Sequence, residues 1–166
     1  MPSFNRDGVK RRLVQVFSEA LPSTVTVSYE WPGDDYRDSF LYFDAPVSGE
    51  ASTDSVGAAR GTTRQAVDRF SIEALLASSG HYTAQDAERA AGDLMRTVFD
   101  TLRRFHRLKD PTGAIGDGST DDYAGVRSVE ISTLDGPAAA SPQPTDDGYV
   151  TVTGMCRFVL TCTSDL

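Results

Sequence analysis

Apolar residues near the start of the chain recur at steps of three and four positions, as on one face of an amphipathic helix. Val9, Leu13 and Phe17 carry this pattern and predict a helix over residues 7–21. The basic triplet at 10–12 lies within it. Three consecutive charges point in different directions around a helix, so the triplet predicts a solvated surface unless a partner covers it.

Four segments alternate between apolar and polar residues, which predicts strands whose side chains point to opposite faces in turn, and segment 39–44 predicts a fifth strand. Segment 39–44 is apolar on both faces, so this strand is expected to be central or covered twice. Gly80 is expected to end the third strand, and Gly154 to mark a bulge or bend in the last. The predicted strands are 24–30, 39–44, 65–78, 125–133 and 149–163.

A second and longer helix is predicted between the N-cap residue Thr83 and the helix-ending Pro111. Leu94, Val98 and Leu102 belong to its apolar stripe. The element order is then α-β-β-β-α-β-β, and short turns between consecutive strands favour antiparallel pairing. The sequence therefore predicts an α+β fold, with a single antiparallel sheet of about five strands and two helices packed on one face.

The chain length of 166 residues fits a single domain over residues 1–166. Hydrophobic residues make up 39% of it, enough for a core without metals or disulfides. Three segments carry few large apolar residues and are rich in small or turn-forming residues. They predict long flexible loops at 45–63 (or a flexible hairpin there), 110–123 and 135–148.

Cys156 and Cys162 both fall within the last predicted strand. At about 3.3 Å per residue they are roughly 20 Å apart, whereas a disulfide needs Cα atoms within about 7 Å. The sequence therefore predicts two buried free thiols.

The formal net charge of −8 makes the chain a poor candidate for binding nucleic acids or anionic membranes, because both are recognised mainly by cations. No apolar run approaches the roughly 20 residues that span a bilayer. Residues 1–10 lack the pattern of a signal peptide, so synthesis in the cytoplasm is expected.

No set of residues converges on an enzymatic reaction. His81 is expected in a loop, and His106 lies near the far end of the second helix, so the two cannot share a metal or a proton. Three glycines at 113–118 follow a helix and precede a strand, the reverse of a phosphate-binding loop. Asp117, Asp121 and Asp122 lack the spacing of an EF-hand and read as a solvated acidic loop. Neither a metal nor a cofactor is predicted.

Arginines gather toward the end of the second helix, with Arg96, Arg103 and Arg107 on one helical face. Such cations suit the helix dipole and can pair with carboxylates one turn away. In so acidic a chain, an acidic surface on a neighbouring copy is a better partner than DNA. Arg60 in the predicted loop 45–63 and Arg64 just after it complete the candidate interface with a neighbouring subunit or a tube.

The order and composition of the segments resemble those of the tail-terminator, or tail-completion, family of long-tailed bacteriophages. The strands TVTVSYE and DSFLYFD follow the first helix. The extended strand DRFSIEALLA then leads at once into the long helix TAQDAERAAGDLMRTVFDTL, and two closing strands end the chain. The resemblance covers nearly the whole chain and rests on element order, not on a diagnostic motif.

The resemblance implies a structural virion protein, not an enzyme, which forms a hexameric ring without a cofactor. The ring would cap the tail tube, contacting the tail-tube protein on one face and the neck or connector protein on the other. DNA would pass through its lumen without specific binding, past acidic side chains for which Asp117, Asp121 and Asp122 are candidates. Two alternatives stay open: another phage neck, connector or tail-tube subunit, and a small-ligand-binding α+β module.

Overall fold

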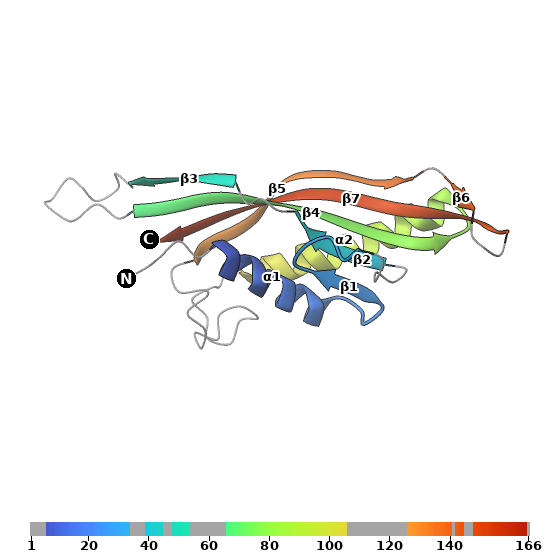
Figure 1. Cartoon of the computed structure of the whole chain (residues 1–166), viewed down its shortest axis with the longest axis horizontal. Helices are drawn as coiled ribbons and strands as arrows, with labels where there is room; N and C mark the ends of the chain where they lie inside the picture. The colour runs from blue at the N-terminus through green and yellow to red at the C-terminus, as the bar shows by residue number, and fades with distance from the viewer. Residues whose placement is uncertain are drawn as a thin grey trace, which may run out of the picture.

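The chain folds into two layers, a sheet and a pair of helices that both lie on one side of it (Figure 1). The computed structural model describes residues 6–33, 39–44, 48–53, 66–105, 126–140, 142–144 and 148–165. The α+β fold and the two helices on one face agree with the sequence prediction. The elements are α1 (Arg6–Ala20), β1 (Val25–Ser28), β2 (Ser39–Phe43), β3 (Ser48–Thr53), β4 (Ala66–His81), α2 (Ala84–Phe105), β5 (Val126–Ala139), β6 (Gln143–Pro144) and β7 (Val150–Asp165).

The sheet is mixed, which corrects the prediction of a wholly antiparallel one. Its order is β1-β2-β4-β7-β5, with β3 beside β4 and β6 beside β7. Only β1 and β2 are parallel among the described strand pairs. Both strands therefore start at the same end of the sheet. A tight hairpin turn at Pro32 and Gly33 would instead have reversed the chain direction.

Two of the predicted loops contain strands. Within 45–63, β3 pairs antiparallel with β4, in line with the hairpin alternative. The prediction of a loop over 135–148 is wrong at its start, because β5 continues to Ala139 and β6 follows. An exposed edge strand needs few large apolar residues, so this stretch looked like a loop. The predicted loop at 110–123 lies outside the described residues.

The predicted end of β4 at Gly80 is also wrong. Gly80 adopts a φ of 84° and the strand continues to His81. The register between β4 and β7 shifts between Ser78 and His81, so β4 carries an extra residue there. The irregularity expected at Gly154 of β7 therefore lies in its partner strand.

The hydrophobic core lies between the sheet and the helices. On the sheet side, alternate residues of β4 and β7 point inward, with their neighbours from β2 and β5 beside them. Stacked aromatic rings join the layers where Phe17 of α1 meets Phe43 of β2, with centroids 6.1 Å apart. The apolar stripe of α2 contributes Met95, Val98 and Leu102 to the core.

Two cations in the first turns of α1 reach inward. Lys10 is 1% exposed, which corrects the prediction of a wholly solvated basic triplet. Its Nζ donates a hydrogen bond to the carbonyl oxygen of Asp44 at 3.0 Å and lies 4.1 Å from the centre of the Tyr29 ring. Burial lowers the pKa of Lys10, while Glu30 and Asp44 oppose that change. Arg6 is the second of these cations, and it forms an ion pair with the buried Asp68 of β4.

The start of α2 lies directly against β7. The Thr83 hydroxyl caps the helix by accepting a hydrogen bond from the backbone N–H of Asp86 at 3.1 Å, as the sequence predicts. Gly154 of β7 faces the first turns of α2, and a Cβ at this position would overlap the carbonyl group of Ala87. The glycine is therefore needed for close approach of the helix to the sheet.

Both cysteines are buried free thiols in β7, as the sequence predicts. Burial raises the pKa of Cys156 from 9.0 to about 11. For Cys162, burial and the nearby Asp68 raise the pKa to about 12.

We expect the free energy of unfolding to fall as the pH rises above about 9, where unfolded thiols ionise while the buried ones keep their protons. Each thiol should contribute a slope approaching about 1.4 kcal/mol per pH unit. Urea unfolding at a series of alkaline pH values measures this slope. A variant with both Cys156→Ala and Cys162→Ala should show a smaller slope, and an equal slope in both proteins would contradict the assignment. Lys10 and Tyr42 titrate in both proteins, so their contributions cancel.

Candidate functional site

The face of the sheet away from the helices carries a small apolar cluster of its own. Phe40 and Tyr42 alternate outward from β2, Leu75 comes from β4 and Met155 from β7. Trp31 lies edge-on to the rings of Phe40 and Tyr42, at centroid distances of 5.7 and 5.1 Å, and is itself 51% exposed. Apart from the segment that carries Trp31, no described helix or strand covers this outer face (Figure 1).

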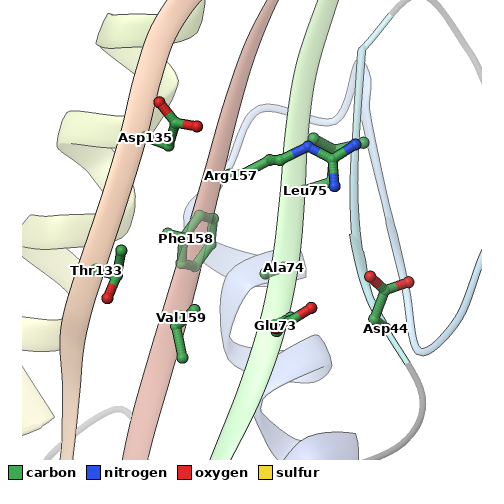
Figure 2. Close-up of a pocket in the computed structure, with 9 residues that line it drawn as sticks. All are labelled: Asp44, Glu73, Ala74, Leu75, Thr133, Asp135, Arg157, Phe158 and Val159. Atoms are coloured by element: carbon green, nitrogen blue, oxygen red, sulfur yellow. The ribbon is translucent and has the colours of Figure 1, made fainter.

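Charged residues surround a hollow of about 150 Å³ on the same face, next to the apolar cluster. Three acidic side chains from different strands line the hollow: Asp44 just after β2, Glu73 on β4 and Asp135 on β5. Arg157 of β7 lies among them, and Figure 2 shows its side chain extending across β4 toward β2. We call this set, with Leu75 and Val159, the sheet hollow.

The electrostatics of the sheet hollow extend to the neighbouring Tyr42. Desolvation raises the pKa of the Tyr42 hydroxyl, Asp44 raises it further, and Arg157 lowers it. Glu73, Asp135 and Arg157 are exposed, so they are available to a partner. The hollow is smaller than the roughly 300 Å³ of a small-molecule pocket.

A second concave surface lies between α2 and β5, on the helical side of the sheet. This groove has a volume of about 510 Å³ and is lined by Gly92, Met95, Arg96, Phe99, Asp100, Arg103, Leu134 and Pro137. Phe99 is 37% and Leu134 40% exposed, so two large apolar side chains are accessible in the same groove. We call this surface the helix groove.

Two of the predicted interface residues, Arg96 and Arg103, belong to the helix groove. Both are exposed and line it, on one face of α2 as the sequence predicts. Arg103 forms a loose ion pair with Asp100, with an N–O distance of 3.9 Å. The other predicted interface residues, Arg60, Arg64 and Arg107, and the candidate lumen residues, Asp117, Asp121 and Asp122, lie outside the described residues.

His81 is the last residue of β4, which corrects its expected place in a loop. Its Nε2 is 2.8 Å from the hydroxyl of Ser78, which is also 3.3 Å from the hydroxyl of Ser39. Ser78 is 4% exposed, so this cluster satisfies polar groups at the end of the sheet and does not present a nucleophile. His106 is outside the described residues.

Sequence reasoning missed the sheet hollow. Asp44 ends the predicted strand 39–44 and Glu73 lies within the predicted strand 65–78, but their convergence with Asp135 and Arg157 depends on the strand order. The available signal was a set of charged residues at outward positions of adjacent strands, next to the outward Leu75. Asp135 was also hidden by its assignment to a loop.

No protein-family model matches the chain, and no curated protein is detectably similar to it. Within the described ranges, no three His, Cys, Asp or Glu side chains are grouped so that they would hold a metal ion. Neither described helix has the length and apolar character needed to cross a bilayer.

Proposed function

We propose that this chain is a structural virion subunit that assembles with copies of itself into a ring, which caps a phage tail tube and joins it to the head-tail connector. The observation that carries the proposal is the outer sheet face, where Trp31 is half exposed over an aromatic cluster beside the charged sheet hollow. Exposed aromatic residues next to charged ones are typical of surfaces that bind other proteins.

A ring requires two different surfaces on each subunit, because a head-to-tail contact must repeat around an axis. The described part of the chain offers two such surfaces on opposite sides of the sheet, the sheet hollow and the helix groove. The place of the ring between tube and connector is supported only by the resemblance in element order.

Negative-stain imaging of cognate tail tubes, with and without the purified protein, tests this role. We expect one ring at one end of each tube, and no further growth of the tube at that end. A protein that instead extends the tube along its length would be a tube subunit, and one that leaves the tubes bare would contradict the proposal.

Binding of a small ligand is the second candidate function, because the volume of the helix groove lies within the range of about 300–1,000 Å³ typical of ligand sites. Under this alternative the protein stays monomeric, and a ligand raises its melting temperature in a saturable manner. A groove variant such as Phe99→Ser would abolish that shift without changing the oligomeric state.

A further inference from the structure

We propose that the helix groove of one copy packs onto the sheet hollow of the next copy, with Phe99 of α2 entering between its acidic residues. The inference rests on the proposed self-assembly and specifies its interface. The occupant of the sheet hollow is therefore a second copy of this chain.

The two edges of the sheet are poorly suited to joining copies. The β5 edge departs from regular register at three places, between Val126 and Ser128, Ile131 and Thr133, and Asp135 and Ala138. Its Pro137 has no N–H to offer to a neighbouring strand. The opposite side of the sheet ends in two short strands, β1 with 4 residues and β3 with 6 residues. Bulges, prolines and short strands are the features that prevent edge-to-edge pairing, so the faces of the layers remain.

The two surfaces carry charges of opposite sign. In the sheet hollow, the acidic Glu73 of β4 and Asp135 of β5 lie on the two strands that flank β7, and the side chain of Arg157 on β7 extends across β4 toward β2. In the helix groove, the acidic Asp100 lies between the basic Arg96 and Arg103. The two arginines of one surface therefore have two acids to meet on the other, and such complementarity fixes register and rejects wrong partners.

The spacing of the charges also matches. Glu73 pairs with Val159 and Asp135 with Arg157, so the two acids are two strands and two residues apart. With strands about 4.8 Å apart and about 3.4 Å per residue, this separation is about 12 Å. Arg96 and Arg103 are two helical turns apart, which is about 10.5 Å at about 1.5 Å per residue. The two separations are similar, so each arginine can lie opposite one of the two acids.

The centre of the proposed contact is apolar on both surfaces. Phe99 lies between the two arginines along α2, and Leu134 of β5 is exposed beside it. In the sheet hollow, Leu75 and Val159 lie near Arg157. A partly exposed aromatic ring with charged residues around it has the form of an interface hot spot. Because the two surfaces are on opposite sides of the subunit, the contact is head-to-tail and closes into a ring when its rotation permits.

Two charge-reversed variants test this contact. The sheet variant carries Glu73→Arg and Asp135→Arg, and the helix variant carries Arg96→Glu and Arg103→Glu. All four positions are exposed, so both variants should fold as the wild type does. Each alone brings like charges together and should weaken self-association by about 100-fold or more. Mixed in equal amounts, the variants should form rings again, because every interface of an alternating ring then joins opposite charges.

Native mass spectrometry of each variant, of the mixture and of the wild type gives the readout, with tail tubes added where the wild type needs them. Arg11→Glu and Glu19→Arg on the exposed face of α1 form the matched control and should assemble as the wild type does. Assembly of either charge-reversed variant alone, or no recovery in the mixture, would overturn this interface while leaving self-assembly intact. A wild type that is monomeric with and without tubes would overturn the proposed function itself, and the interface with it.

Discussion

Replacing Gly154 with alanine is expected to destabilise the protein by about 3 kcal/mol or more, the upper range for overpacking a core. The glycine lies in β7 where the first turns of α2 contact the sheet, and its added Cβ would overlap the backbone carbonyl group of Ala87. A backbone group cannot rotate away as a side chain can. The helix must therefore shift as a unit, which separates its apolar stripe from β4 and β7.

Gly92→Ala is the matched control for this prediction. Gly92 lies in the interior of α2, and its added Cβ would be 3.7 Å from the Cγ of Pro137, an ordinary contact. This variant should be neutral or more stable by up to about 1 kcal/mol, because alanine favours a helix over glycine. Chemical unfolding measures both variants, and a Gly154→Ala protein as stable as the wild type would show that α2 does not approach β7 so closely.

Replacing Arg6 with glutamine is expected to lower the free energy of unfolding by about 3 kcal/mol, because it leaves a buried carboxylate without its cation. The Nε and Nη2 atoms of Arg6 donate to the two carboxylate oxygens of Asp68 at 2.8 and 2.6 Å. Asp68 is 1% exposed, whereas the Arg6 side chain is 25% exposed, so the figure is at the lower end for a buried pair. The guanidinium group also lies 5.6 Å from the centre of the Phe70 ring.

A double-mutant cycle isolates this pair. Asp68→Asn removes the buried charge, so the second change, Arg6→Gln, should cost much less in that background than in the wild type. Glutamine at Arg11, whose ion pair with Asp7 is exposed, should cost less than about 1 kcal/mol. Equal effects of Arg6→Gln in both backgrounds would contradict the coupling between α1 and β4.

The helices could be predicted from the sequence because their signals are local. The apolar stripe of α2 repeats over many turns, and Thr83 caps its start as expected. The parallel pairing of β1 with β2 could not be predicted, because it depends on the path of residues between them. The full length of β5 was hidden as well, since the stretch with the exposed Asp135 and Pro137 has the composition of a loop.

The candidate site was partly predictable for the same reason. Arg96 and Arg103 share a helix face by spacing alone, so their place on one surface followed from the sequence. The sheet hollow joins Asp44, Glu73, Asp135 and Arg157, which are far apart in the chain. Their convergence required the order β2-β4-β7-β5, which no local pattern of residues encodes.

The measurement that tests the central claim most directly is the mass of the assembled protein, determined by native mass spectrometry over a range of concentrations and repeated with cognate tail tubes. The account predicts a single closed oligomer of fixed subunit number, which we propose to be six, either in solution or on the tubes. Monomers at every concentration, with and without tubes, would contradict it, as would an open-ended series of masses.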